Sequence, residues 1–259
     1  MFVDSHCHID FPELSVQLPA LLERMHTEQV THALCVSVNL ADWPNVIKLA
    51  DDHFNLYASV GVHPDHDPDS VELQEEDLLS RAAHPRVVAI GETGLDYYRL
   101  GENLLWQQRR FRTHIRAAIA CGKPLIIHTR AAAKDTLALM REERAGEVSG
   151  VMHCFTESWE VAHAALDLGF YISFSGIITF KNATDLCEVV RKVPLEQMLI
   201  ETDSPYLAPV PHRGKLNQPA YVRHVAECVS AIKNIPLDEV ARVTTENFFS
   251  LFKHARKTQ

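Results

Sequence analysis

The most regular feature of the chain is a series of short apolar runs, separated by longer stretches of helical periodicity. The runs predict eight strands, at residues 2–9, 32–38, 56–63, 87–93, 124–129, 150–155, 170–176 and 198–203. The stretches 102–122 and 158–169 space their apolar residues as a helix does, and each ends at or next to a glycine, which commonly stops a helix. This alternation predicts parallel strands joined by right-handed crossovers.

The number of strand–helix units indicates one particular architecture. Eight units in 259 residues match the size of a (β/α)8 TIM barrel, which is the predicted α/β fold. A doubly wound open sheet is the structural alternative. Because no repeat, low-complexity tract or linker interrupts the pattern, we expect residues 1–259 to form a single domain.

Ionisable side chains stand at or near the ends of the predicted strands. The first, third, fourth, fifth, sixth and eighth strands end with His6 and His8, His63, Glu92, His128, His153 and Asp203, respectively. In a (β/α)8 barrel the C-terminal strand ends meet at one mouth, where active sites lie. Because burying such groups unpaired is costly, we expect them to form one site rather than to serve packing.

The composition of this set points to metal binding. Without His63 it offers four imidazoles and two carboxylates, more than a single catalytic zinc requires. Two divalent ions about 3.5–4 Å apart, sharing a carboxylate, would use all six groups. Imidazoles favour zinc or manganese over magnesium, which prefers oxygen ligands, but the sequence leaves zinc, manganese and magnesium open.

Charge and cysteine usage bear on the binding partners and the cellular compartment expected for the protein. The formal charge of −9 counts against non-specific nucleic-acid binding, although two bound divalent cations would reduce it. No apolar run reaches the ~20 residues that span a bilayer, and no secretory signal precedes the first strand. Six scattered cysteines without a CxxC pair favour the reducing cytoplasm. We expect neither membrane association nor an obligate protein partner.

Six stretches of the chain carry a family resemblance. In order they are "DSHCH", "GVHP", "GETGLDYY", "IHTR", "HCF" and "ETDSPYLAPVPHRGKLNQP". Over most of its length the chain resembles the TatD family of metal-dependent hydrolases, a group of amidohydrolase-like barrels. The stretches "FYISFSGIITF" and "PVPHRGKLNQPAYV" resemble its bacterial YcfH-type branch. The resemblance implies a (β/α)8 barrel and metal-dependent phosphodiesterase activity on DNA, commonly as a 3′ exonuclease.

The resemblance also implies roles for individual residues. His6, His8 and Asp203 would hold the first metal, and His128 and His153 the second. Glu92 would bridge the two metals. As a metal-bound carboxylate beside the nucleophilic water, Asp203 is also the candidate general base.

Four residues near the predicted mouth are candidates for substrate contact. Arg130 lies two residues past His128, and its planar guanidinium suits a phosphate; a surface ion pair is the alternative. His63 is a candidate for hydrogen bonding to the phosphate or for orienting its "HP" loop. Arg213 and Lys215, in "HRGK", would contact a nucleic-acid backbone or remain merely solvated.

Other residues flank the predicted ligands. Cys7 and Cys154 are expected to face away from the site into packing. Asp96, Tyr97 and Tyr98 are expected at the rim, where a tyrosine would either stack on a base or pack against the protein.

Three functions fit these features. The first is a dinuclear metal-dependent phosphodiesterase, a deoxyribonuclease acting on DNA ends or on another phosphodiester. The second is a hydrolase of a small amide, ester or phosphomonoester at the same metals. The third, a non-catalytic metal-binding or interaction protein, ranks last because Glu92 and Asp203 are both present.

Overall fold

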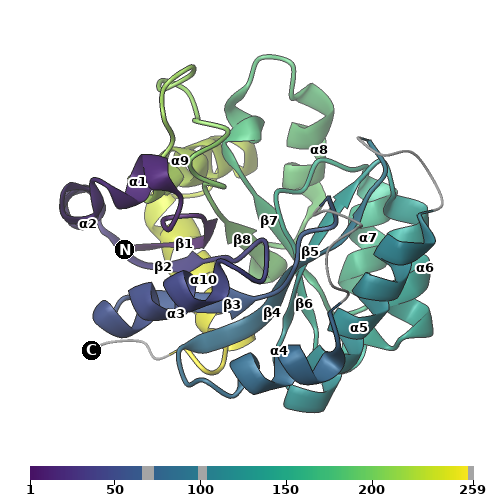
Figure 1. Ribbon diagram of the computed structural model, residues 1–259. Coiled ribbons are helices and arrows are strands. Elements are labelled where there is room, and N and C mark those ends of the chain that lie inside the picture. Colours follow the sequence, from purple (N-terminus) through teal and green to yellow (C-terminus); the bar gives the residue numbers. More distant parts are fainter. Residues whose placement is uncertain (66–72, 99–103, 256–259) are drawn as a thin grey trace.

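The computed structural model describes residues 1–65, 73–98 and 104–255, and within these ranges eight strands form one sheet (Figure 1). The strands are β1 (Phe2–Cys7), β2 (Val30–Cys35), β3 (Leu56–Val60), β4 (Val87–Asp96), β5 (Leu125–Arg130), β6 (Gly150–Met152), β7 (Tyr171–Phe174) and β8 (Met198–Ile200). Each strand pairs in parallel with the next one along the chain. Each overlaps one of the eight predicted runs.

The sheet closes where the segment that follows β8 meets β1. Cys7 forms a parallel bridge with Ser204, and the His8 N–H donates to the Ser204 carbonyl at 2.8 Å. One step closer to β8, the Asp203 N–H donates to the His6 carbonyl at 3.0 Å. Because these bonds join the first and last members of the sheet, the predicted (β/α)8 barrel is confirmed and an open sheet is excluded.

Helices surround the barrel (Figure 1). They are α1 (Pro12–Ser15), α2 (Leu18–Thr27), α3 (Trp43–Asp52), α4 (Glu75–Ala82), α5 (Leu105–Cys121), α6 (Ala133–Glu142), α7 (Trp159–Asp167), α8 (Thr184–Lys192), α9 (Val222–Lys233) and α10 (Leu237–Leu251). The predicted helix 102–122 corresponds to α5, although residues 102 and 103 lie outside the described ranges, and 158–169 corresponds to α7. Gly122 ends α5 with a left-handed backbone (φ +68°), as the glycine stop predicts. No helix in the described part of the chain has the length and apolar character needed to cross a bilayer.

Apolar side chains close the end of the barrel where the strands begin. This closed-end cluster joins residues from seven strands or their flanks to residues of α10 and beyond: Val3, Leu34, Val36, Tyr57, Val88, Ala89, Ile126, Val151, Leu199, Phe248, Leu251, Phe252 and Ala255. The side chain of Asn247 on α10 donates to the carbonyls of Leu195, just before β8, and Met198, its first residue, both at 2.8 Å. α10 is thereby fixed across the closed end.

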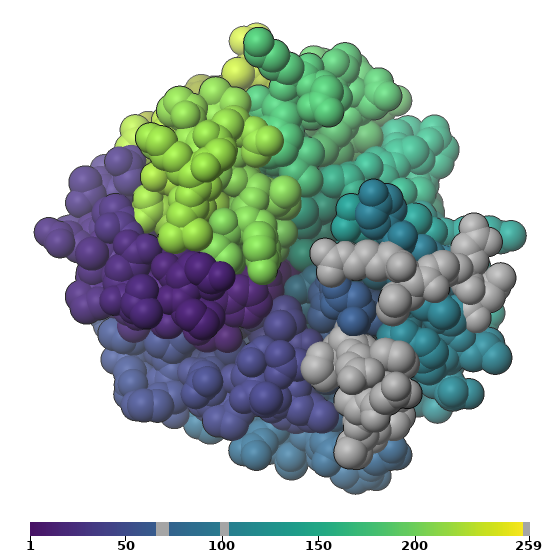
Figure 2. Space-filling model, turned by 45° about the horizontal axis from the view of Figure 1, so that its top comes forward, coloured from purple at the N-terminus to yellow at the C-terminus, as the bar shows by residue number. Residues whose placement is uncertain are grey.

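The opposite end, the mouth, is formed by the segments that follow the strands. One of these segments follows β8 and lies next to the first strand; it is called the β8 loop here and comprises residues 204–218. Figure 2 shows this yellow-green segment beside the purple N-terminal residues on one face of the molecule. Asn217 ties the loop to the barrel, because its side-chain N–H groups donate to the carbonyls of Thr202, at 2.9 Å, and Tyr206.

Candidate metal centre

The six predicted ligands and His63 gather at the mouth, although only some belong to strands. Three lie within strands: His6, Glu92 and His128. Four lie in the segments that follow a strand: His8, His63, His153 and Asp203. Most of the strands thus end before the positions predicted from the apolar runs, whereas β4 runs on to Asp96. For these four residues, the backbone conformation after the strand, rather than the strand itself, sets the direction of the side chain.

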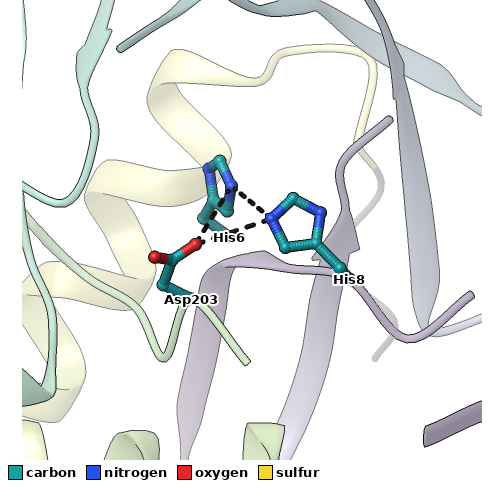
Figure 3. Close-up of side chains that lie close together, drawn as sticks. All are labelled: His6, His8 and Asp203. Carbon is teal, nitrogen blue, oxygen red and sulfur yellow. Dashed lines mark hydrogen bonds and ion pairs between the residues drawn. The ribbon is translucent and has the colours of Figure 1, made fainter. Parts of the chain in front are cut away.

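His6, His8 and Asp203 form the first group (Figure 3). The Nε2 atoms of His6 and His8 lie 3.3 Å apart, and Asp203 Oδ1 lies 3.7 Å and 3.5 Å from them. The second nitrogen of His8, Nδ1, lies 2.8 Å from the Val36 carbonyl, which can only accept a hydrogen bond. In its neutral form His8 therefore carries its proton on Nδ1, and its Nε2 presents a lone pair to the group.

Glu92 lies between this group and a second one. Its Oε2 is 3.4 Å from His6 Nε2. Its Oε1 is 2.7 Å from His153 Nε2, 3.1 Å from His128 Nδ1 and 3.4 Å from His63 Nε2. The carboxylate is only 3% exposed, and burial opposes its ionisation, but the surrounding histidines outweigh burial and hold the pKa of Glu92 well below its usual range. One buried carboxylate thus directs one oxygen to each group.

The second group includes a residue that the sequence assigned elsewhere. His63, Glu92 and His128 offer atoms that all lie within 4.8 Å of one another, and His153 approaches the same Glu92 oxygen. His128 Nε2 lies 3.3 Å from the Asp96 carboxylate, and His63 Nδ1 bonds to Asp65. Each acid can hold the proton-bearing nitrogen of its histidine outward, which turns the other nitrogen toward Glu92 as a lone pair.

These donors fit divalent cations. The ring nitrogens lie 3.3–3.4 Å from one another and beside carboxylate oxygens, and these carboxylates outweigh burial and raise the pKa of His8, His128 and His153. A divalent cation would take the place of the protons that this arrangement favours. Imidazole and carboxylate are ordinary ligands of zinc and of other transition metals. The outward nitrogens of His8, His63 and His128 have oxygen partners, which is the arrangement that orients histidines for metal binding.

Glu201 is a member of this centre that the sequence analysis missed. It is fully buried, its Oε1 accepts the Cys154 N–H at 2.7 Å, and the same oxygen lies 3.4 Å from His153 Nδ1. Glu201 also groups with His6 and His153, whose rings stack at 4.0 Å. In the described residues, His6 Nδ1, His153 Nδ1 and Glu201 Oε2 are buried without a well-formed hydrogen bond. Glu201 is thus the carboxylate that faces the outward nitrogen of His153, with His6 in the same group.

The charges of the centre are strongly coupled. Burial opposes ionisation of Asp203, but the hydrogen bond from His8 and the charge of His6 outweigh it and lower the pKa of Asp203. Burial likewise opposes a charge on His153, but Glu92 and Glu201 raise its pKa well above the ordinary value. His153 therefore occupies a position where the surrounding carboxylates favour positive charge, as a bound cation would supply.

A cavity of about 640 Å³ opens over the centre. Its lining comes from β4 and β5 and from the segments that follow the other six strands: His8, Phe11, Val38, His63, Asp65, Glu92, Asp96, His128, Thr129, Arg130, His153, Cys154, Thr156, Ile177, Asp203, Tyr206 and Leu207. The polar half of this lining belongs to the centre, whereas Phe11, Tyr206 and Leu207 form an apolar side.

The four predicted substrate contacts fall in different places. Arg130 and His63 line the cavity, and the Arg130 guanidinium stacks over the Tyr98 ring at 4.0 Å. Among the described residues that line the cavity, neither Arg213 nor Lys215 is found. Arg213 instead stacks over the Phe180 ring at 3.6 Å.

The flanking residues also differ from one another. Cys7 faces away from the centre as expected, and its thiol donates to the Leu34 carbonyl. The expectation for Cys154 is wrong, because this residue lines the cavity. β6 ends at Met152, and Cys154 has a left-handed backbone (φ +42°), which breaks the strand alternation on which the expectation rested. Burial raises the pKa of the Cys154 thiol well above its usual range.

Gly94 explains why glycine recurs in the stretch "GETGLD". It pairs with His128 across β4 and β5 and has φ +137°, a conformation that side chains rarely adopt. A Cβ atom there would lie 2.0 Å from the His128 carbonyl oxygen. This glycine lets β4 approach His128 closely, next to Glu92 and Asp96 on the same strand.

Comparison with known proteins agrees with this geometry. The family model described as "TatD related DNase" matches residues 3–253. The uncharacterized metal-dependent hydrolase YcfH of Escherichia coli K12 is 48% identical over 253 residues, covering 96% of this chain and 95% of that protein. The uncharacterized metal-dependent hydrolase YabD of Bacillus subtilis is 39% identical, covering 98% and 99%.

Solved structures extend the comparison. The TatD homologue YjjV of Escherichia coli K12 superposes with a TM-score of 0.89 at 29% identity, covering 97% of this chain and 98% of that one. An organophosphorus hydrolase variant superposes with a TM-score of 0.68 at 12% identity, which shows a shared barrel fold alone. With a family match over nearly the whole length and relatives close to half identical, the chain belongs to the TatD family.

Proposed function

We propose that this chain is a metal-dependent hydrolase that cleaves phosphodiesters at DNA ends, in the manner of a 3′ exonuclease. His6, His8 and Asp203 hold one divalent cation, His128 and His153 hold a second, and Glu92 lies between the two. The observation that carries the metal assignment is the position of Glu92, with Oε2 toward His6 and Oε1 toward His128 and His153.

Bound divalent cations supply two chemical effects at such a centre: they lower the pKa of water and they neutralise charge on a phosphoryl oxygen. The protein residues supply positioning and proton transfer. Asp203 is ionised at neutral pH and its side chain is 15% exposed, so it can accept a proton from water in the cavity. His63, on the other side of Glu92, can hydrogen-bond the substrate phosphate or complete the second group of ligands.

The cavity wall supports a phosphodiester substrate. Arg130 is exposed at the rim and its guanidinium is held over Tyr98, so it can offer two parallel N–H donors to a phosphate. Phe11 and Tyr206 lie on the apolar side with their ring centroids 6.3 Å apart. Tyr206 is exposed and Phe11 is half-buried, and aromatic rings that reach the surface can stack on an unpaired base at the end of a nucleic-acid strand.

One observation favours a second function, the hydrolysis of a small ester, amide or phosphomonoester. A volume of about 640 Å³ lies within the range of cavities that enclose small molecules, ~300–1,000 Å³. We rank it below the nuclease proposal because Arg130 has no evident task with a neutral ester or amide, and the aromatic rim has none with a small phosphomonoester.

A substrate panel tests the proposal. Protein stripped of metal with a chelator and reloaded with manganese, zinc or magnesium is assayed on four substrates: oligonucleotides with a free 3′ end, oligonucleotides with a blocked 3′ end, a phosphomonoester and a neutral ester. We expect metal-dependent release of mononucleotides from free 3′ ends alone. Turnover of the phosphomonoester or ester with intact oligonucleotides would select the second function. Cleavage that ignores the 3′ block would reject the exonuclease type.

A further inference from the structure

A second pair of histidines converges outside the centre. His212 lies in the β8 loop and His224 lies on α9, and their Nε2 atoms are 3.2 Å apart. This separation nearly equals the 3.3 Å between the Nε2 atoms of His6 and His8. The family assignment and the proposed function give this second pair no task.

Both rings of the pair are held in place. His224 Nδ1 lies 2.9 Å from the Glu227 carboxylate, one turn further along α9. The ionised carboxylate can only accept, so His224 carries a proton on Nδ1, and in the neutral ring Nε2 presents a lone pair to His212. The His212 ring stacks on Tyr221 with centroids 3.9 Å apart and planes 3° from parallel. This is the carboxylate–histidine arrangement that orients metal ligands.

The surroundings admit an ion from solvent. The His224 side chain is 26% exposed and that of Glu227 is 41% exposed. Burial, His224 and Lys215 together lower the pKa of His212, which keeps its ring neutral, whereas Glu28, on the segment after α2, acts in the opposite direction. Glu227 adds a negative charge beside His224, but Arg223 pairs with both Glu28, at 3.4 Å, and Glu227, at 3.1 Å. Two carboxylates therefore face two cationic side chains, and the two imidazole nitrogens, not a surplus of negative charge, are what would attract an ion.

We propose that Nε2 of His212 and Nε2 of His224 form a binding site for a transition-metal dication, with water completing its coordination. Two imidazoles suit zinc, nickel or copper, whereas magnesium and calcium prefer oxygen ligands. When the ion binds, His212 carries its proton on Nδ1, and both Nε2 lone pairs point to the ion. The ion then links the β8 loop to α9, and the same loop supplies Tyr206 and Leu207 to the cavity.

The competing explanation is a plain hydrogen bond between two neutral imidazoles, with one Nε2–H as donor. Metal stoichiometry separates the two. Equilibrium dialysis against zinc is carried out on the wild type and on His224→Gln, with the mouth centre intact in both. We expect the wild type to retain one more zinc ion per chain than the variant.

A matched control is available on α7. His163 is exposed on a helix and lies 3.2 Å from the Asp167 carboxylate, and its ring contact is with Trp159 rather than with a second imidazole. His163→Gln should retain the wild-type zinc content. Glu227→Gln keeps both ligands of the pair but removes the orienting charge, and should weaken zinc binding at this site by roughly 10–100-fold.

His212→Gln provides the same test from the loop side and keeps the proposal testable if His224→Gln does not fold. It should lose the same single ion, and the double variant should lose no more than either single variant. Equal zinc content in the wild type and in both single variants at saturation would overturn the proposal. So would an extra magnesium ion that depends on His224, because it would show a different kind of site.

Discussion

The two ends of the barrel bury side chains of opposite kinds. At the closed end, Phe248 and Phe252 are fully buried among apolar neighbours. At the mouth, His6 and Glu92 are just as buried but titratable, and their neighbours carry lone pairs or negative charge. Apolar packing stabilises the fold, whereas a buried cluster of imidazoles and carboxylates is costly to desolvate and needs shared protons or a cation to offset that cost. The comparison assigns stability to one end and chemistry to the other.

The largest effect should follow from removing the charge shared by the two groups at the mouth. Glu92→Gln keeps the size of the side chain but takes away the negative charge that faces both groups of histidines. We expect turnover to fall by orders of magnitude, metal content to drop and the metal-free protein to remain folded but less thermally stable, because the histidines that lower the pKa of Glu92 lose their partner. Turnover assays, elemental analysis and thermal melting measure these three. Near-normal turnover with both ions retained would show that Glu92 is not shared.

A change at the closed end should lower the free energy of unfolding and leave turnover nearly unchanged. Phe248→Ala removes a fully buried ring that lies 4.8 Å from the ring of Phe252, and large-to-small changes of this kind cost about 3–5 kcal/mol. Denaturant titration should show this loss, while kcat per folded molecule stays within about twofold of the wild type. A large drop in kcat with unchanged stability would break the separation between the two ends.

Substitution of Arg130, at the rim of the mouth, should affect a phosphodiester substrate and a neutral ester differently. If the substrate is a phosphodiester, Arg130→Ala removes charge-assisted hydrogen bonds worth about 1.5–3 kcal/mol each, which lowers kcat/KM by roughly 10–100-fold. Arg130→Lys should restore part of this loss, because an ammonium group cannot reproduce the planar fork. A neutral ester should be little affected. Arg141→Ala, at an exposed position on α6, serves as the control. Equal losses on both substrates would mean that Arg130 has a structural role.

A smaller, pH-dependent effect on stability is expected from a buried histidine that lies outside both ends of the barrel. His114 on α5 accepts the Val62 N–H at 3.0 Å, and burial lowers its pKa to about 4. Above pH 6.5 this ring is neutral in the folded and unfolded chains, so its contribution is complete. As the pH falls from 6.5 toward 4, the unfolded chain takes up the proton first and the free energy of unfolding decreases.

The expected loss from this histidine is about 1 kcal/mol between pH 7 and 5.5, and about 3 kcal/mol once the pH is below 4. Denaturant titrations of the wild type and of His114→Gln across this range isolate the contribution, because the other titrating groups are shared. The variant should show the shallower pH dependence. Identical slopes would assign the acid sensitivity to other groups.

The barrel could be predicted because each strand appears in the sequence as a recognisable apolar run. These apolar runs are short and regular, and ionisable residues stand at or near the same end of six of the eight predicted strands, so the mouth could be located without coordinates. His6 and His128 come together from residues 122 positions apart for this reason alone.

Parts of the centre could not be predicted because they depend on backbone turns and on closure. Glu201 stands two residues before Asp203 in "ETD", and only the path of the chain after β8 turns it toward His6 and His153. Asp96 pairs with His128 because β4 is longer than its apolar run. The "HRGK" stretch marked Arg213 and Lys215 by charge, but charge alone does not tell whether a loop side chain turns into the cavity.

The central claim, that Glu92 joins two cation sites, is tested most directly by electron paramagnetic resonance of the manganese-loaded protein. The measurement uses His212→Gln, so that the ions counted are those at the mouth, and compares it with the same protein carrying Glu92→Gln. We predict saturation at two manganese ions per chain and a spin-coupled spectrum, as expected for ions about 3.5–4 Å apart. The Glu92→Gln protein should bind fewer ions and lose the coupling. Saturation at one ion, or two ions with the isolated six-line signal while Glu92 is present, would contradict the account.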